Sequence, residues 1–187
     1  MRLVLLGPPG AGKGTQGQAL AQVYGVPHVS TGDIVRDHVA RHTEFGRKVE
    51  AAIAAGNFAS DTDILYWVGV RLAASDAQNG YILDGFPRDV AQAEAFVQAL
   101  NAVVDLEVAE EALVERLSKR LIRDDKTGQM VRRSDDEPDA VRHRLEVYKE
   151  RTAPLQAYYE QRGLLKRVDA LGDPVTVTER IQSALAK

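Results

Sequence analysis

The sequence of 187 residues contains no cysteine, which excludes disulfide bonds and thiolate metal sites. It has no internal repeat and no low-complexity segment. No apolar run approaches the ~20 residues that a membrane-spanning helix needs. The first strand that we expect begins at residue 3, which leaves no room for a signal peptide. We therefore expect a cytoplasmic protein that does not bind membranes.

An excess of charge of one sign is also lacking. The 24 Lys and Arg residues face 27 Asp and Glu residues, giving a formal net charge of −3. Nucleic-acid-binding domains are usually strongly basic, so we expect no nucleic-acid partner. The 44% hydrophobic and 27% charged residues are typical of a globular domain, and the length suits one domain with small insertions. An enzyme is the default class.

The most informative segment is a glycine-rich loop, residues 7–15. It follows a short apolar run suited to a buried strand and precedes a helical pattern at residues 16–24. Glycines let backbone N–H groups converge on an anion, and the helix adds its N-terminal N–H groups and dipole. Gly7, Gly12 and Lys13 fit the phosphate-loop pattern G-x-x-x-x-G-K, but the hydroxyl comes one place late, at Thr15. The alternative is a simple turn rich in Gly and Pro.

Five apolar segments alternate with helical patterns, which predicts an α/β fold with a five-stranded parallel sheet flanked by helices. The strands are expected at residues 3–6, 26–29, 81–84, 103–108 and 164–168. The helices are expected at 16–24, 33–42, 44–55, 61–74 (with Asp61 as the N-cap), 90–100, 110–121, 138–152 (with Pro154 breaking or restarting the helix) and 174–185. Ligands of such sheets bind beyond the carboxyl ends of the strands, so residues 7–13, 31–33 and 84–88 should meet at one edge.

Two segments do not fit the sheet. Residues 30–59 place two short helices between strands two and three, and residues 122–137 are polar. Both are expected to be flaps over the site, with surface decoration as the alternative.

Asp84 ends an apolar strand, a position that serves Mg²⁺ near a phosphate loop; a helix cap is the alternative. Phosphoryl transfer also needs cations around the transferring group, and guanidinium groups bind phosphate in bidentate fashion. Eight arginines fall near the expected site, and about half would contact phosphate if the others are solvated or paired: Arg36, Arg88, Arg116, Arg120, Arg132, Arg133, Arg142 and Arg144.

Several motifs occur in the order found in adenylate kinases, through nearly the whole chain, and the sequence resembles that family. They are residues 7–16 (GPPGAGKGTQ), 30–33 (STGD) with Arg36, 83–88 (LDGFPR) with Gln92, 133–136 (RSDD), 142–145 (RHRL) and 152–155 (TAPL) with Tyr158 and Tyr159. The resemblance implies one P-loop kinase domain over residues 1–187, with a core (1–29, 60–120 and 137–187), a helical AMP-binding segment (30–59) and a short lid (about 121–136).

The activity that the resemblance implies is reversible phosphoryl transfer from ATP to AMP, giving two ADP, with Mg²⁺ bound with ATP and held by Asp84 through water. A monomer is expected. The implied catalytic residues are Lys13, Asp84, Arg88, Arg120, Arg133 and Arg144. The implied ATP contacts are Gly10, Ala11, Gly12, Lys13, Gly14, Thr15, Arg116, Arg120 and Gly172. The implied AMP contacts are Thr31, Arg36, Asn57, Phe58, Ala59, Gly85, Phe86, Pro87, Arg88, Gln92, Arg133 and Arg144.

The sequence departs from the family pattern in three places. Residues 57–59 replace an aliphatic pair near the AMP base, and Ala170 replaces a frequent glycine. The lid is short and has no cysteine, so no structural zinc is expected. Which of Arg132 and Arg133 clamps phosphate depends on the alignment; Arg133 is chosen because Asp135 and Asp136 follow it at the family's spacing.

Three other functions compete with this interpretation. A UMP/CMP kinase is the nearest, but Thr31 and Gln92 favour AMP because those kinases tend to carry other residues there. A GTP-hydrolysing switch would share the loop, but the guanine-reading motif Asn-Lys-x-Asp is absent. A non-catalytic nucleotide-binding module would not need so many arginines.

Overall fold

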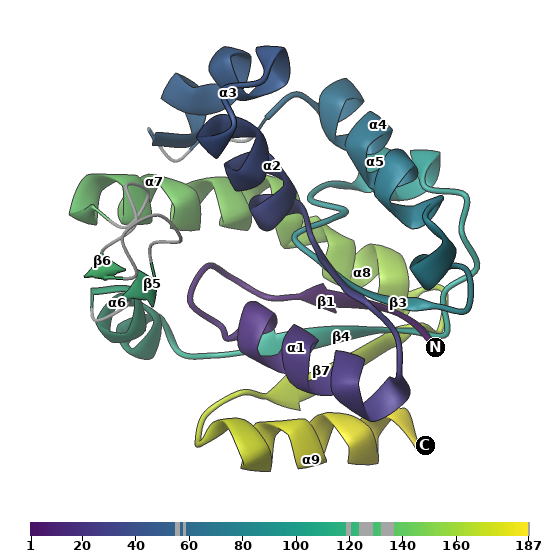
Figure 1. The fold of residues 1–187 in the computed structure, drawn as a ribbon. Helices are drawn as coiled ribbons and strands as arrows, with labels where there is room; N and C mark the ends of the chain where they lie inside the picture. Colours follow the sequence, from purple (N-terminus) through teal and green to yellow (C-terminus); the bar gives the residue numbers. More distant parts are fainter. Residues whose placement is uncertain (55–56, 58, 119–120, 124–128, 132–136, 187) are drawn as a thin grey trace.

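The computed structural model describes residues 1–54, 57, 59–118, 121–123, 129–131 and 137–186. Its centre is a five-stranded parallel sheet in the order β2-β3-β1-β4-β7, flanked by helices (Figure 1). The strands are β1 (Arg2–Leu6), β2 (His28–Ser30), β3 (Tyr81–Asp84), β4 (Ala102–Glu107) and β7 (Leu165–Asp169). The predicted α/β class and the five-stranded parallel sheet are confirmed. No helix in these ranges has the length and apolar character needed to cross a membrane.

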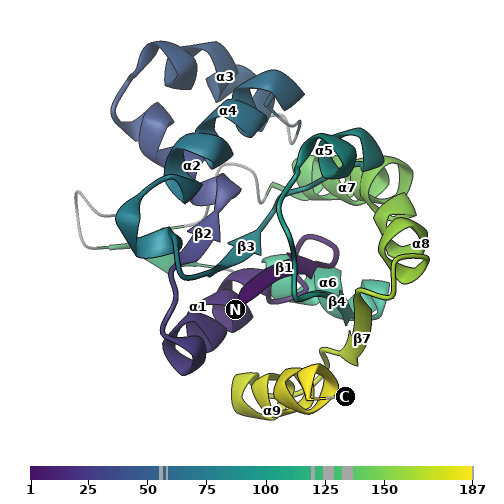
Figure 2. The ribbon, with the colours of Figure 1, turned by 90° about the vertical axis from the view of Figure 1, so that its right-hand side faces the viewer.

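Helices connect and cover the strands. They are α1 (Lys13–Tyr24), α2 (Thr31–Ala40), α3 (Glu44–Ala54), α4 (Asp61–Leu72), α5 (Val90–Ala95), α6 (Glu110–Ser118), α7 (Pro138–Val147), α8 (Pro154–Glu160) and α9 (Pro174–Leu185). Shorter elements are a 3₁₀ turn, η1 (Ser75–Ala77), a π-helical turn, η3 (Tyr148–Thr152), and an antiparallel pair, β5 (Ile122–Arg123) with β6 (Met130–Val131). Figure 2 shows α9 on the opposite side of the sheet from α2, α3 and α4.

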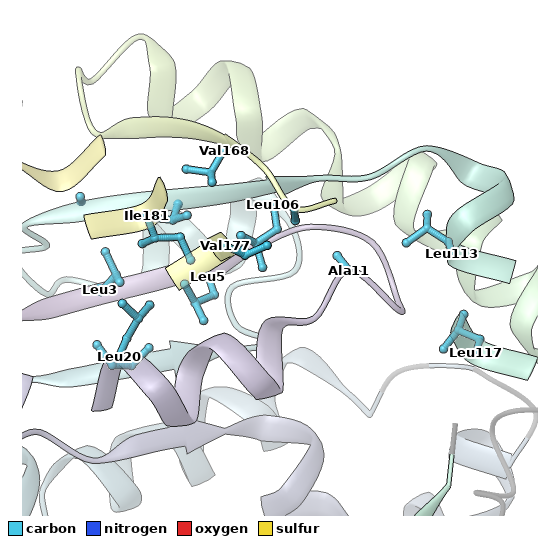
Figure 3. Close-up of a cluster of buried hydrophobic side chains, with 14 of the residues drawn as sticks. Leu3, Leu5, Ala11, Leu20, Leu106, Leu113, Leu117, Val168, Val177 and Ile181 are labelled. Carbon is cyan, nitrogen blue, oxygen red and sulfur yellow. The ribbon is translucent and has the colours of Figure 1, made fainter. Parts of the chain in front are cut away.

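The apolar run of β1 fills the cores on both faces of the sheet, because successive side chains of a strand point to opposite faces. Leu3 and Leu5 pack in the cluster shown in Figure 3, which includes residues of α1, α6 and α9. Val4 and Leu6 pack in the second cluster, with residues of α2, α3, α4 and α8. This burial on both faces explains why the strand lacks an alternation of apolar and polar residues.

Several helix boundaries differ from those expected: α1 begins at Lys13, α2 spans Thr31–Ala40 and α4 ends at Leu72. Three further differences concern the start of α4 and the ends of α5 and α6. Ser60, not Asp61, is the N-cap of α4: its Oγ accepts a hydrogen bond from the backbone N–H of Asp63 at 3.2 Å. Helix α5 ends at Ala95 instead of residue 100, since Phe96 leaves the helical conformation and its ring packs edge-on against Phe86. Helix α6 ends at Ser118 within the described part of the chain, and Leu121 is not helical.

The predicted helix at residues 138–152 is formed by α7 and the π-helical turn η3, and the helix restarts at Pro154 as α8, as predicted. Pro138 occupies the first turn of α7, where its missing N–H is tolerated, and Pro154 starts α8. Between them the π-helical turn η3 bridges the two helices, and the N–H of Ala153 donates to the carbonyl of Tyr148 at 2.9 Å.

Helices α2 and α3 form a small helical unit beside the sheet, in the segment expected to bind the monophosphate (Figure 1). An aromatic cluster joins them to α4: the centroid of the His38 ring lies 5.2 Å from that of Phe45 and 4.1 Å from that of Trp67 on α4.

Candidate active site

One large cavity, of about 1280 Å³, lies beyond the carboxyl ends of several strands. Its walls come from the loop after β1, the start of α2 after β2, the loop after β3 and the turn after β7. Residues of α6, α7 and η3 complete it. The three segments that sequence analysis expected at one sheet edge therefore meet there, as the rule for parallel sheets predicts.

The glycine-rich loop forms one wall and contains three glycines with positive φ angles: 132° at Gly7, 85° at Gly10 and 97° at Gly12. A Cβ at Gly7 would lie 2.9 Å from the carbonyl oxygen of Leu106, and one at Gly10 would lie 3.0 Å from the Leu117 side chain. Larger residues would therefore be strained and would clash at Gly7 and Gly10. No side chain caps α1, whose first turn lines the cavity, so its N-terminal N–H groups can face an anion.

Lys13 is the first residue of α1, and its side chain folds back over this loop. Its Nζ donates to the carbonyl oxygens of Gly7 at 2.7 Å and Pro8 at 3.0 Å. The ammonium is thus held beside the position where the loop would receive phosphate.

Asp84 ends β3 and lines the same cavity, with its carboxylate 3.6 Å from His28 Nε2. This separation exceeds a hydrogen bond but leaves the two groups in close electrostatic contact. Burial alone would raise the pKa of Asp84, but His28 and the positive charges of Lys13 and Arg88 outweigh burial and hold the pKa below its ordinary value. Asp84 is therefore ionised at neutral pH.

Arg88, Arg36 and Arg144 bring three guanidinium groups to this cavity from three parts of the chain. Arg88 Nε donates to the Gly85 carbonyl at 2.7 Å, and Arg36 pairs with Asp33. Burial, followed by the like charges of Arg144, Arg36 and Arg151, lowers the pKa of Arg88 to about 10, which still leaves it protonated at neutral pH. Such mutual repulsion is relieved by an anion, and these cations make phosphate a fitting ligand.

A second set of predicted residues lies on the side of the turn after β7. Arg116 on α6 donates to the Ala170 carbonyl at 2.9 Å, and Gly172 follows in the same turn.

Asn57 and Ala59 also line the cavity, and Asn57 Oδ1 lies 2.8 Å from His143 Nε2. The predicted site residues in the cavity wall are Gly10, Ala11, Gly12, Lys13, Gly14, Thr15, Arg36, Asn57, Ala59, Asp84, Gly85, Pro87, Arg88, Arg116, Arg144 and Gly172.

Three predicted AMP contacts lie behind the wall instead. Thr31 is 1% exposed and its hydroxyl donates to the Gly85 carbonyl at 2.9 Å. The preceding residue, Ser30, is the N-cap of α2. Phe86 is fully buried in the core. Gln92 is 2% exposed; its Oε1 accepts from the Arg88 N–H and its Nε2 donates to Asp61. In this structure these residues support the loop that carries Arg88.

Six residues that sequence analysis named lie outside the described residues: Phe58, Arg120, Arg132, Arg133, Asp135 and Asp136. The wall also contains residues to which sequence reasoning gave no role, among them His28 and Gln16. Gln16 Nε2 donates to the Pro174 carbonyl at 3.0 Å, joining α1 to the start of α9. His28 reaches Asp84 because β2 pairs with β3, a pairing that no local pattern specifies.

A parallel sheet in this order, with a glycine-rich loop joining its central strand to α1, is the fold of a P-loop kinase. The family model for adenylate kinase matches residues 5–164. An adenylate kinase of Xanthomonas campestris pv. campestris (strain 8004) is 47% identical over 194 residues, covering all of both chains. That of Agrobacterium fabrum is 46% identical, covering all of this chain and 98% of its own. The chain belongs to the adenylate kinase family, a family of phosphotransferases.

Proposed function

We propose that this chain catalyses reversible phosphoryl transfer from ATP to AMP, giving two ADP, in the cavity described above. The observation that carries the proposal is the convergence of the glycine-rich loop and Lys13 with three arginines on one cavity. A binding module would need the loop alone, whereas a transferase must hold charged donor and acceptor phosphates together. The family match favours AMP kinase activity over the UMP/CMP alternative.

ATP occupies the side of the cavity formed by the loop, α1 and the turn after β7. The backbone N–H groups of residues 10–15 surround its phosphates, and the ammonium of Lys13 exchanges the carbonyls of Gly7 and Pro8 for phosphate oxygens. Arg116 and Gly172 lie beside the adenine. Arg120, outside the described residues, is proposed to join this set.

AMP occupies the opposite side, where Arg36 and Arg88 bind its phosphate and Arg144 lies between the two nucleotides. The AMP phosphate oxygen is already anionic, so no residue needs to act as a covalent nucleophile or strong base. The arginines align the acceptor and neutralise the charge that spreads over the transferring group. Arg133 is proposed to complete this set.

Mg²⁺ is the proposed cofactor, and the donor set fits an ion that arrives with ATP. Asp84 supplies one ionised carboxylate to the cavity, and no cluster of three His, Asp or Glu side chains that could hold a metal occurs among the described residues. A single carboxylate acting through water suits Mg²⁺, which keeps several of its waters. Bound with ATP, Mg²⁺ neutralises charge on the phosphates.

The domain organisation expected from the sequence remains part of this proposal: residues 30–59 close over AMP and residues of about 121–136 form a lid that excludes water. Thr31 and Gln92 are the proposed readers of the adenine. The Thr31 hydroxyl donates its one hydrogen to Gly85, whereas the Gln92 amide has a second N–H and a second lone pair beyond its bonds to Asp61 and Arg88. A monomeric, cytoplasmic enzyme is also proposed.

The proposal is tested by coupled ADP formation with ATP and Mg²⁺ plus AMP, CMP or UMP. We expect kcat/KM for AMP to exceed that for the pyrimidine nucleotides by at least about tenfold, since a smaller base leaves buried polar groups unpaired at about 1–3 kcal/mol each. Equal use of CMP would overturn the AMP assignment and keep the kinase function. No ADP from any monophosphate would overturn the function itself.

A further inference from the structure

Arg151, in the π-helical turn η3, joins two carboxylates from distant parts of the chain. Its Nη2 lies 3.1 Å from Asp61 Oδ1 and 3.2 Å from Asp61 Oδ2, and it also donates to Asp89 Oδ2. Asp61 is the first residue of α4, two positions beyond residue 59. Asp89 is the N-cap of α5. One guanidinium therefore links three elements that meet behind the cavity.

The same two carboxylates hold the loop that carries Arg88. Asp89 Oδ1 accepts from the N–H of Gln92 at 2.8 Å, and Asp61 Oδ1 accepts from Gln92 Nε2 at 2.6 Å. Gln92 Oε1 in turn accepts from the backbone N–H of Arg88 at 2.8 Å. Gln92 thus transmits the position of both carboxylates to the Arg88 backbone.

The Arg88 carbonyl is fixed from the other side by the neighbour of Arg151. Thr152, also in η3, donates its hydroxyl to this carbonyl at 2.8 Å. Thr152 is 7% exposed, so this hydrogen bond is shielded from water. The backbone N–H and carbonyl of Arg88 are both held by side chains that depend on the placement of η3.

Charge explains why an arginine is needed between these carboxylates. Asp61 and Asp89 contact the same guanidinium nitrogen, so they would repel each other without a cation between them. Although burial alone would lower it, the hydrogen bonds and charges of Asp89 and Asp61 raise the pKa of Arg151 above its ordinary value. Since one guanidinium nitrogen makes these contacts, an ammonium group with its three donors could replace part of them.

We propose that Arg151 is a positioning residue for AMP: by binding Asp61 and Asp89 together, it fixes the loop that presents Arg88 to the AMP phosphate. This role rests on the proposed function, in which Arg88 contacts AMP. ATP is proposed to lie against the loop after β1 and the turn after β7, and among the described residues no hydrogen bond joins these two segments to Arg151. Loss of Arg151 should therefore weaken the use of AMP selectively.

The test compares the KM values for AMP and ATP in Arg151→Met, Arg151→Lys, Asp89→Asn and the double variant Arg151→Met/Asp89→Asn. We expect KM for AMP to rise about threefold to tenfold in Arg151→Met, with KM for ATP within about twofold of wild type. Arg151→Lys should recover part of the loss. The double variant should be no worse than Arg151→Met, because the two residues act through one contact.

Arg167→Met is the matched control, since Arg167 on β7 pairs with Glu160 at 2.8 Å away from the cavity. Both of its KM values should match wild type. Asp89→Asn keeps a capping side chain on α5, so it supplies the result if Arg151→Met does not fold. Normal turnover by wild type with an unchanged KM for AMP in the variants, or an equal rise in both KM values, would overturn the role of Arg151 alone. Absence of turnover in wild type would overturn the proposed function.

Discussion

At the scale of single residues, Lys13 has both a structural and a chemical role. Its hydrogen bonds to Gly7 and Pro8 place a cation in the loop before any ligand binds. Removing this cation should leave the buried strand and helix around it intact. It should, however, remove charge stabilisation from the transferring phosphates.

For Lys13→Ala we therefore expect kcat to fall by about 10²–10³-fold, the effect of losing one electrostatic donor in an active site. Steady-state ADP formation measures kcat, and circular dichroism checks the fold. Lys149→Ala is a suitable control, because Lys149 is an exposed lysine paired with Glu110 at 2.8 Å outside the main cavity. Turnover of Lys13→Ala within about tenfold of wild type would show that the ammonium is not needed.

Asp105 on β4 has a buried carboxyl group, and burial disfavours its ionised form. It is 1% exposed; its Oδ2 accepts from Gln156 Nε2 at 2.7 Å, whereas Oδ1 has no hydrogen-bond partner among the described residues. Burial raises the pKa of Asp105, Glu107 adds to this effect, and the bond from Gln156 offsets only part of it. The folded state therefore favours the protonated form more than the unfolded state does.

This shift predicts a pH-dependent gain in stability for Asp105→Asn. As the pH rises through the raised pKa, wild type must bury a charge and loses stability, whereas the amide stays neutral and still accepts from Gln156. The melting temperature of the variant should exceed that of wild type at pH 7, by about 2–4 °C for each kcal/mol relieved. The difference should shrink as the pH falls through the raised pKa. Equal melting at pH 7, or a difference that grows on acidification, would contradict the prediction.

At the scale of secondary-structure elements, the start of α4 depends on Ser60. Its Oγ accepts from the Asp63 N–H at 3.2 Å and donates to Asp63 Oδ2 at 2.5 Å. Lys48 on α3 binds the same carboxylate at 2.8 Å, which joins α3 to the cap. The cap thus helps to hold the helical segment against the core.

Ser60→Ala should lower the free energy of unfolding by about 1 kcal/mol, the usual cost of losing an N-cap. Urea denaturation measures the change. Ser183→Ala is the control: Ser183 is an exposed residue within α9, where alanine is the better helix former and no loss is expected. If both variants kept the stability of wild type, the cap would contribute nothing measurable.

At the scale of the whole molecule, the cavity is bounded by the α2–α3 segment on one side and by α7 and η3 on another. Charged side chains on these walls must all reach the phosphoryl group that is transferred. We therefore expect the walls to close once donor and acceptor are bound. We propose that residues 30–59 and residues of about 121–136 carry out this closure.

A bisubstrate analogue that joins ATP to AMP should therefore slow amide hydrogen exchange in residues 30–59 and 121–136. Mass spectrometry of peptic fragments measures the effect. The core helix α8 serves as an internal reference, because its residues do not line the cavity. Protection confined to the glycine-rich loop would contradict closure by both segments.

The sequence by itself determined the parallel sheet and the glycine-rich loop, because both follow from local patterns. The apolar run of β1 predicts a strand buried on both faces, and the glycines before Lys13 provide positive φ angles that other residues avoid. Pro138 and Pro154 likewise marked the starts of α7 and α8, since proline lacks the N–H group of a helix interior.

Only the tertiary structure decided which side chains face the cavity and which support it from behind. Gln92 binds Asp61, 31 residues away, and Arg151 binds Asp89, 62 residues away. His28 lies beside Asp84 through the pairing of β2 with β3. Such contacts depend on how the strands are ordered and how the helices pack over them. Local composition and periodicity constrain neither, so the supporting network of Arg88 could not be predicted from the sequence.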